Sequence, residues 1–278
     1  MEAIDQYVVI GNPIEHSKSP KIHTMFAEQT GEKIAYNKLF CPINDFSRVV
    51  SNFFAAGGCG ANVTVPFKLE ANNFAHRQSS RAEHAQAANT LINRGGVISA
   101  ENTDGIGLVR DITNNLGFSL AGKSILIVGS GGAARGVLFP LLMQAPKSIK
   151  VVNRTEEKAH KLIRSVTDET ISSSIVISSG GLTDLDDCVF DLVVNATSSS
   201  LSGELFPIGT HVLGPNALAY DMMYGKEGSS FDKWALQAKA DHIADGLGML
   251  VEQAAESFFL WRGKRPETKP VMEALRTR

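Results

Sequence analysis

The chain has 278 residues, of which 43% are hydrophobic and 20% are charged. This composition excludes a disordered or collagen-like chain, and at roughly 150 residues per domain the length predicts two domains. Lys and Arg number 27 against 29 Asp and Glu, so the formal charge of -2 provides no basic field to hold a nucleic acid.

The cysteines and the apolar segments indicate the cellular compartment in which the protein is expected. Cys41, Cys59 and Cys188 are odd in number and lack C-x-x-C spacing, which favours free thiols in a reducing compartment over a zinc site. Residues 1–5 include Glu2 and Asp5 where an export signal needs basic residues. The longest apolar run, 137–143, is far shorter than the roughly 20 residues of a membrane span. We therefore expect a cytoplasmic protein with no membrane segment and no metal.

The first part of the chain alternates strand and helix patterns. Residues 7–10 predict a buried strand, and Ser19 as N-cap with Pro20 after it predicts a helix that Gly31 ends. Alternating strands and helices indicate a mostly parallel sheet. The further elements expected here are strands over 35–40 and 61–65, a helix over 46–56 and a β-hairpin over 89–100.

The second part has the pattern of a doubly wound α/β domain. Residues 124–128 form a continuous apolar strand that leads directly into a glycine turn, and an amphipathic helix follows Gly246. The other strands expected in this part are 149–152, 175–178, 192–195, 218–221 and 242–244.

The glycine turn predicts a dinucleotide site. Gly129, Gly131 and Ala134 match G-x-G-x-x-G/A, which supplies a tight turn, a close approach to pyrophosphate and a small residue where helix meets strand. NAD enzymes carry Asp or Glu at the end of the second strand, whereas this chain has 153–155, in which Arg154 can pair with a 2′-phosphate. An ordinary glycine-rich turn and a solvated arginine are the alternatives.

Three features of the first part are candidates for substrate chemistry. Ser17 and Ser19 precede a helix, so their hydroxyls and the positive end of the dipole could hold a carboxylate, with simple capping as the alternative. Lys68 falls in the first turn of a helix expected to begin at Pro66, where a solvated surface lysine is the alternative. Asp104 falls where the two domains should join and where clefts form, although an Asp before Gly commonly marks a turn.

Taken together and in this order, the motifs resemble those of the shikimate dehydrogenase family. The substrate-side and cofactor-side motifs agree, and the segment 153–155 resembles the NADP-using branch. The resemblance covers nearly the whole chain, in the segments Gly11–Pro13, His16–Pro20, Asn62–Lys68, Ala88–Thr90, Asn102–Gly105, Gly129–Ala134, Asn153–Thr155, Asn195–Ser198, Tyr220–Tyr224 and Asp245–Gln253.

The resemblance implies an enzyme that uses NADP to reduce 3-dehydroshikimate reversibly to shikimate, in the biosynthesis of chorismate and the aromatic amino acids. It implies an N-terminal α/β substrate domain with a mostly parallel sheet, residues 1–103 completed by the C-terminal helices of 246–278. A Rossmann-type, doubly wound dinucleotide-binding domain is expected over 104–245. The partners of the protein would be its small-molecule substrate and its cofactor. The chain would be a monomer or a homodimer.

The resemblance also assigns roles to residues. Lys68 and Asp104 would be the catalytic pair. The substrate would be bound by Ser17, Ser19, Thr64, Asn89, Tyr224 and Gln253. The cofactor would be bound by Gly129, Ser130, Gly131, Gly132, Ala133, Asn153, Arg154, Thr155, Ala196, Thr197, Ser198, Met222 and Gly246. A broader quinate/shikimate dehydrogenase and a non-catalytic NADP-binding redox sensor are the competing interpretations, and the complete Lys68–Asp104 pair argues against the sensor.

Overall fold

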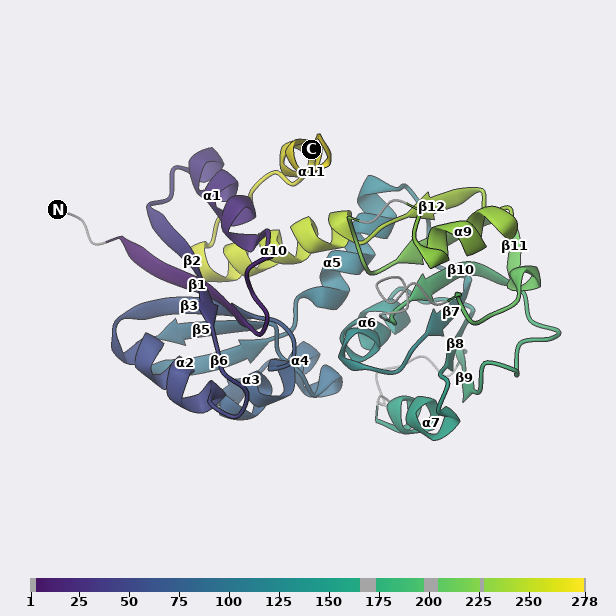
Figure 1. Cartoon of the computed structure of the whole chain (residues 1–278), viewed down its shortest axis with the longest axis horizontal. Helices are drawn as coiled ribbons and strands as arrows, with labels where there is room; N and C mark the ends of the chain where they lie inside the picture. The colour runs from purple at the N-terminus through teal and green to yellow at the C-terminus, as the bar shows by residue number, and fades with distance from the viewer. Residues whose placement is uncertain (1–3, 166–173, 198–204, 226–227, 278) are drawn as a thin grey trace. The chain divides into compact units, whose positions relative to one another are not determined.

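The computed structural model describes residues 4–165, 174–197, 205–225 and 228–277, and the chain divides into two α/β units (Figure 1). The first, here called the N-terminal unit, combines Met1–Gly107 with Leu250–Arg278. The second, here called the Rossmann unit, is Leu108–Met249. Each unit is built around its own six-stranded sheet, which confirms the predicted fold class.

The N-terminal unit has a mixed sheet with the strand order β2-β1-β3-β5-β6-β4. Strand β1 is parallel to β2 and β3, whereas β5 is antiparallel to β3 and to β6, as expected of the predicted hairpin. The strands are β1 (Asp5–Gly11), β2 (Ile34–Phe40), β3 (Gly58–Val63), β4 (Arg77–Gln78), β5 (Thr90–Arg94) and β6 (Val97–Glu101).

Helices cover both faces of this sheet (Figure 1). Alternate side chains of β1 point to opposite faces, so that Val8 and Ile10 join one apolar cluster and Tyr7 and Val9 join another. The helices are α1 (Ser19–Thr30), α2 (Phe46–Ala55), α3 (Lys68–Phe74), α4 (Ser80–Ala85) and α11 (Lys269–Arg276). The chain passes between the units within α5 (Asp104–Arg110) and α10 (Leu247–Arg262).

The start of α1 differs from the prediction. Ser19 is the first helical residue rather than the N-cap; Lys18 occupies the cap position, and the Ser19 N–H donates to Ser17 Oγ over 3.3 Å. The side-chain oxygen that accepts the first N–H of this helix is therefore that of Ser17, two residues before Ser19. The end of the helix is as predicted, because Gly31 adopts a left-handed φ of 69° and donates its N–H to Ala27 O.

The third strand and the helix after it also have other boundaries than predicted. Strand β3 ends at Val63, and a turn closed by the Phe67 N–H donating to Thr64 O separates it from α3, which begins at Lys68 and not at Pro66. Lys68 is thus the first residue of its helix. The turn places Thr64 and Lys68 at the carboxyl end of β3.

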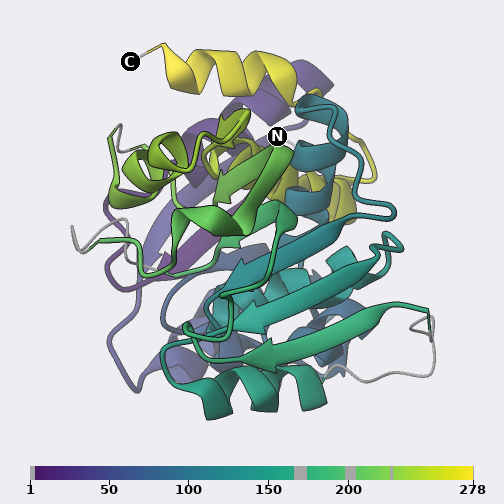
Figure 2. The same ribbon diagram turned by 90° about the vertical axis from the view of Figure 1, so that its right-hand side faces the viewer.

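The Rossmann unit has a fully parallel sheet with the order β12-β11-β10-β7-β8-β9, seen in Figure 2. The chain winds outward from β7 in one direction and then from β10 in the other, the doubly wound arrangement that was predicted. Its elements are β7 (Ser124–Val128), α6 (Gly132–Leu142), β8 (Ser148–Val152), α7 (Glu156–Arg164), β9 (Val176–Gly180), β10 (Phe190–Asn195), β11 (Leu213–Asp221), α9 (Ser230–Gln237) and β12 (His242–Ala244).

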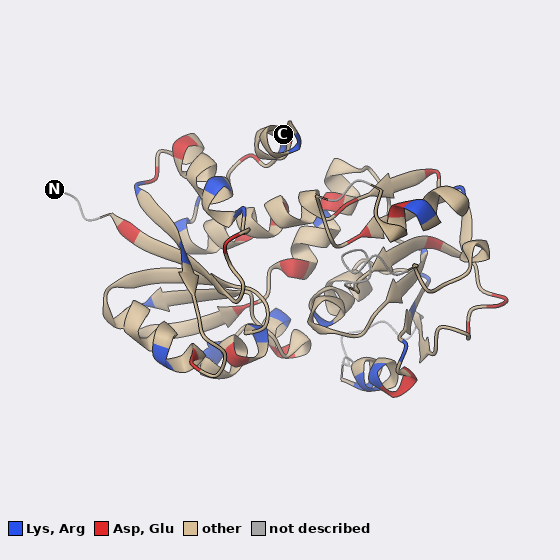
Figure 3. Cartoon of the chain, in the orientation of Figure 1, with Lys and Arg blue, Asp and Glu red and all other residues tan. Residues whose placement is uncertain are grey.

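Acidic and basic residues are interspersed along the ribbon of both units (Figure 3). Among the helices of the described residues, none has both the length and the apolar character that crossing a membrane requires.

A buried histidine links the stability of the N-terminal unit to pH. His23 on α1 is fully buried and stacks on Tyr36, with ring centroids 4.2 Å apart and planes within 6°. Burial lowers the pKa of His23 to about 3. The folded protein therefore keeps this imidazole neutral, whereas the unfolded chain binds a proton below a pH of about 6.5.

Because only the unfolded state gains this proton, the contribution of His23 to stability is complete above pH 6.5 and is lost as the pH falls toward 3. We expect about 2 kcal/mol of this loss between pH 7 and pH 5. The measurement is urea unfolding at both pH values for the wild type and for His23→Phe, whose smaller pH dependence would confirm the assignment. An equal loss in both proteins would contradict it.

Candidate active site and cofactor-binding loops

Predicted catalytic and substrate residues of the N-terminal unit gather at one edge of its sheet. The parallel strands β1 and β3 both end at this edge, and the antiparallel β5 begins there, with Thr90 paired to Asn62 on one side and Glu101 on the other. The residues at this edge are Ser17 and Ser19 after β1, Thr64 and Lys68 after β3, Asn89 before β5 and Asp104 after β6.

Lys68 and Asp104 form an ion pair. Lys68 Nζ lies 2.5 Å from Asp104 Oδ2, and the other carboxylate oxygen accepts from Asn89 Nδ2 over 2.8 Å. The Asp104 side chain is only 9% exposed, whereas that of Lys68 is 23% exposed. The carboxylate is thus fixed by two donors, while the ammonium keeps access to solvent or to a bound molecule.

Asn89 connects this pair to α10. Its amide nitrogen also lies 3.1 Å from Gln253 Oε1 and 2.9 Å from Thr103 Oγ1, and its Oδ1 accepts from the Thr103 N–H over 2.8 Å. The structure therefore joins four of the predicted site residues, Lys68, Asp104, Asn89 and Gln253, in one set of contacts.

The network extends to buried polar residues that were not assigned from the sequence. Asn62 Nδ2 lies 3.0 Å from Ser257 Oγ and 3.2 Å from Thr90 Oγ1, and Tyr36 Oη donates to Asn62 Oδ1 over 2.6 Å. Asn62 is a polar residue in a strand of otherwise small or apolar residues, and Thr90 directly precedes the apolar pair Leu91 and Ile92; these two patterns were the available signal. Ser257 carried none, because its role depends on how α10 packs.

The other predicted substrate residues of this unit lie at the same edge. Ser19 is buried beside Tyr36; burial raises the pKa of Tyr36, and the hydrogen bond to Ser19 partly opposes that rise. Thr64 packs against Gly11, where a Cβ would lie 2.5 Å from Thr64 Cγ2. The contact of Ser17, Ser19 and Thr64 with a substrate stays a prediction.

The glycine turn of the Rossmann unit has the geometry that the fingerprint requires. Gly129 has a φ of 111°, which favours glycine, and its N–H donates to Val152 O over 2.8 Å. A Cβ on Gly131 or Gly132 would meet no described atom within 4 Å, so the backbone at the start of α6 is open to close approach. Ser130 lies in the same turn, and Ala133 is the second residue of α6.

Asn153, Arg154 and Thr155 follow β8 as predicted. Asn153 Nδ2 donates to Thr155 O over 2.9 Å and so shapes the segment, and Thr155 occupies the N-cap position of α7. The Arg154 side chain is exposed. A guanidinium in this position is free to meet a phosphate from solvent.

The loops after β10, β11 and β12 are tied together. Asn195 Oδ1 accepts from Thr197 Oγ1 over 2.6 Å, and the Met222 N–H donates to Asn195 O over 3.0 Å. The Gly246 N–H donates to Met223 O, and a Cβ on Gly246 would lie 2.2 Å from Met222 O. The segments around Ala196, Met222 and Gly246 thus meet at the carboxyl edge of the sheet, where doubly wound folds bind ligands.

Two predicted site residues remain. Ser198 lies outside the described residues. Tyr224 follows β11 in the Rossmann unit and is partly buried, which raises the pKa of its phenol. Its contact with a substrate stays a prediction.

A doubly wound nucleotide fold, joined in one chain to an α/β unit with a lysine–aspartate pair, defines a dinucleotide-dependent dehydrogenase. The chain matches three family models: shikimate dehydrogenase substrate binding domain over residues 9–91, shikimate/quinate 5-dehydrogenase over 109–202, and shikimate 5′-dehydrogenase C-terminal domain over 246–276.

Similar proteins match nearly the whole chain. The shikimate dehydrogenase (NADP(+)) of Cupriavidus taiwanensis is 50% identical over 276 residues, which cover 98% of this chain and 93% of that one. The crystal structure of an Ael1 enzyme from Pseudomonas putida has a TM-score of 0.91 at 44% identity, covering 98% of both chains. The shikimate 5-dehydrogenase of Thermus thermophilus, in complex with NADP(H) and shikimate, has a TM-score of 0.86 at 26% identity, covering 98% of this chain and 99% of that one. The chain belongs to the shikimate dehydrogenase family, as its motifs predicted.

A buried pair in the Rossmann unit holds the start of α10 next to Gly246. Tyr220 Oη donates to Asp111 Oδ2 over 2.6 Å, and Asn115 Nδ2 donates to Oδ1 over 2.9 Å. Burial and the charge of Asp111 raise the pKa of Tyr220. Gly248 packs directly against this carboxylate, since a Cβ there would lie 1.9 Å from Asp111 Oδ1.

Because both Asp111 oxygens are engaged, the carboxylate cannot move aside for a methyl group without losing a buried hydrogen bond. Gly248→Ala should therefore lower the free energy of unfolding by roughly 1–3 kcal/mol, measured by urea unfolding without ligands. Gly132→Ala, a helical position with open space around it, is the matched control and should be neutral or slightly stabilising. Equal effects of the two substitutions would contradict the packing argument.

Proposed function

We propose that this chain catalyses the NADP-dependent, reversible reduction of 3-dehydroshikimate to shikimate. The observation that carries the proposal is the Lys68–Asp104 ion pair at the sheet edge, in a chain half identical to a protein named shikimate dehydrogenase (NADP(+)). The reaction belongs to chorismate and aromatic amino acid biosynthesis. A cytoplasmic monomer or homodimer, with substrate and cofactor as its partners, is part of the same proposal.

The chemistry requires one hydride and one proton. NADPH, when bound, supplies the hydride to the carbonyl carbon. Lys68 Nζ donates the proton to the carbonyl oxygen as it becomes a hydroxyl, and takes it back in the reverse direction. Asp104 holds Nζ in place and balances its charge, and Asn89 fixes the carboxylate from the other side.

The N-terminal unit is the proposed substrate domain, over 1–103 and 246–278. Ser17 and Ser19 hold the substrate carboxylate with their hydroxyls, next to the N-terminal end of α1. Thr64, Asn89 and Gln253 are the other substrate-binding residues proposed in this unit, and Tyr224 is the substrate-binding residue proposed in the Rossmann unit. The support for Asn89 is its direct contact with the Asp104 carboxylate, and the support for Gln253 is its contact with Asn89.

The segment 104–245 is the proposed cofactor domain. Gly129–Ala133 receive the pyrophosphate at the start of α6, and Arg154 pairs with the 2′-phosphate between Asn153 and Thr155. Ala196, Thr197 and Ser198, the last outside the described residues, would contact the cofactor, and Met222 and Gly246 would lie beside its nicotinamide.

A broader quinate/shikimate dehydrogenase is the second candidate, since one matching family model is described as shikimate/quinate 5-dehydrogenase. Absorbance of the reduced cofactor, with shikimate or quinate and NADP or NAD, separates the candidates. Rapid reduction only with shikimate and NADP supports the proposal. Comparable rates with quinate favour the broader enzyme, and no reduction in any mixture favours a redox sensor.

Lys68→Ala should lower kcat by roughly 100-fold or more with little change in the KM for shikimate, because proton transfer acts in the transition state. Steady-state kinetics with shikimate and NADP make the measurement. Lys21→Ala, which removes an exposed lysine of the same unit, is the control and should keep the wild-type kcat. A kcat unchanged in Lys68→Ala would exclude the proton-transfer role.

Arg154 should determine the preference for NADP over NAD. A phosphate gains a bidentate, charge-assisted contact that a hydroxyl cannot make, and its loss costs roughly 1.5–3 kcal/mol, on the order of 10- to 150-fold in affinity. Arg154→Ala should weaken NADP by this factor and leave NAD nearly unchanged. The control is Arg164→Ala, which removes an exposed arginine of α7 and should leave kcat/KM unchanged both for NADP and for NAD. An equal loss for both cofactors in Arg154→Ala would mean that Arg154 does not read the phosphate.

A further inference from the structure

The segment that carries Asp104 is held by its backbone. Three consecutive N–H groups, from the residue after β6 to the first residue of α5, each donate to a side-chain oxygen. Asn102 donates to Glu101 Oε1 over 2.8 Å, Thr103 to Asn89 Oδ1 over 2.8 Å, and Asp104 to Asn102 Oδ1 over 3.1 Å. The start of α5 therefore depends on these acceptors. Asn89 belongs to the proposed site, whereas Glu101 touches neither Lys68 nor the Asp104 side chain in any contact described above.

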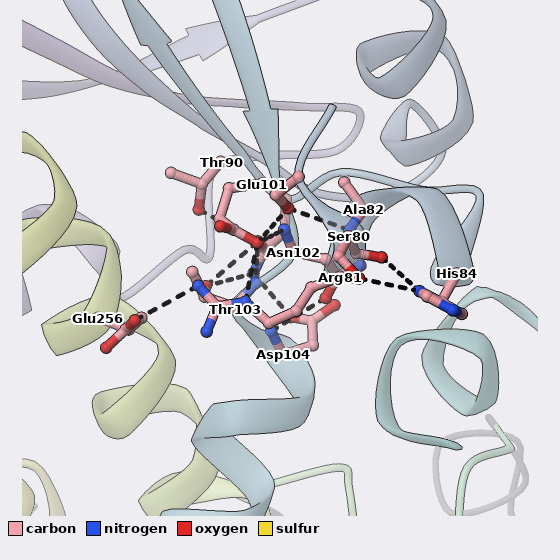
Figure 4. Close-up of polar contacts among 12 residues, drawn as sticks. Ser80, Arg81, Ala82, His84, Thr90, Glu101, Asn102, Thr103, Asp104 and Glu256 are labelled. Atoms are coloured by element: carbon pink, nitrogen blue, oxygen red, sulfur yellow. Dashed lines mark hydrogen bonds and ion pairs between the residues drawn. The ribbon is translucent and has the colours of Figure 1, made fainter. Parts of the chain in front are cut away.

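Glu101 is the charged member of this set. Its Oε1 accepts from three donors: the Asn102 N–H, Ser79 Oγ over 2.6 Å and Arg81 Nε over 2.9 Å. Figure 4 shows Glu101 among Arg81, Asn102 and Asp104. The Glu101 side chain is only 10% exposed. A carboxylate buried to this degree is stable only with such donors, so its position is set by all three.

Arg81 and Ser79 connect Glu101 to two helices. Ser79 caps α4 by accepting from the Ala82 N–H, and Arg81 lies on the same helix. Arg81 Nη2 lies 3.4 Å from Glu256 Oε1 on α10, and Arg265 Nη2 lies 2.6 Å from the other Glu256 oxygen. Burial opposes the charge of Arg81, but Glu101 and Glu256 outweigh it and raise the pKa of its guanidinium. The ion pairs of Arg81 with Glu101 and Glu256 thus link β6, α4 and α10.

We propose that Glu101 is a positioning residue for the reaction: through the backbone of 102–104 it fixes the Asp104 carboxylate against Lys68 Nζ. This inference rests on the proposed function of that pair. A misplacement of about 1 Å in a catalytic group costs on the order of 100-fold in rate. The hydrogen bonds to Glu101 restrain a movement of that size.

The variants separate hydrogen bonding from charge. Glu101→Leu removes the acceptor at similar volume and should lower kcat by roughly 10- to 100-fold, with the Kd for NADP unchanged. Glu101→Gln keeps an oxygen where Oε1 lies, and should restore kcat to within about 3-fold of wild type, since a neutral acceptor still holds the Asn102 N–H. A loss in Glu101→Gln as large as in Glu101→Leu would overturn the backbone-positioning role.

Glu32→Leu is the matched control. Glu32 is a carboxylate of the same unit, 11% exposed, that pairs with Arg262 and Lys264 away from the catalytic pair. Its replacement should lower the free energy of unfolding while kcat stays at the wild-type value. A fall in kcat equal to that of Glu101→Leu would mean that lost stability alone explains both.

The decisive measurement is a double-mutant cycle with Asp104→Asn. If Glu101 acts through Asp104, Glu101→Leu should cost less than about 3-fold in kcat in the Asp104→Asn background. The same 10- to 100-fold loss in both backgrounds would overturn the proposal. Should Glu101→Leu not fold, Arg81→Met carries the same cycle, with an expected loss of roughly 3- to 10-fold in the wild-type background only.

The catalytic role of Lys68 and Asp104 and the positioning role of Glu101 are tested by different variants. Wild-type kcat in Lys68→Ala or Asp104→Asn overturns the proposed catalytic pair. The expected losses in those variants, together with wild-type kcat in folded Glu101→Leu, overturn the positioning role alone.

Discussion

The cost of burying the Asp104 carboxylate is the constraint on which the N-terminal unit depends. An ionised carboxylate that is 9% exposed is stable only with donors on its oxygens. Lys68 and Asn89 supply them, and each comes from a different element, α3 and the segment before β5. Satisfying one carboxylate therefore brings together the ends of three elements, and the same contacts leave the Lys68 ammonium beside the edge where a substrate can reach it.

Both units place their polar side chains by the same rule. Strands supply apolar side chains to the cores, so the polar groups collect where strands end and the backbone leaves the sheet. In the N-terminal unit these ends carry Lys68 and Asp104, and in the Rossmann unit they carry the Gly129 turn and the loop of Met222. The division of labour proposed for the units follows from the Lys68–Asp104 pair at the strand ends of the first and from the glycine turn and Arg154 at the strand ends of the second.

The sequence predicted those parts of the fold that depend on local patterns. The apolar segment before Gly129 and the stop at Gly31 need only their neighbours, and both lie where expected. The predicted cap at Ser19 and helix start at Pro66 were wrong, because bonds to Ser17 and Thr64 decide those ends. For the site, the residue types and order predicted which side chains matter, while their contacts required the strand register and the packing of α10.

The polar network shows why that packing could not be anticipated. Ser257 lies within hydrogen-bond distance of Asn62 although 195 residues separate them, and no local pattern specifies such a pair. Buried ion pairs such as Arg81 with Glu101 and Glu256 add little net stability, since well-packed apolar residues in their place are often as stable or more so. Removing one residue of such a pair, in contrast, leaves the other charge buried without its partner, so that its desolvation is no longer compensated. A network of this kind therefore favours a single geometry over small displacements, and the proton transfer proposed for Lys68 would depend on that geometry more than on added stability.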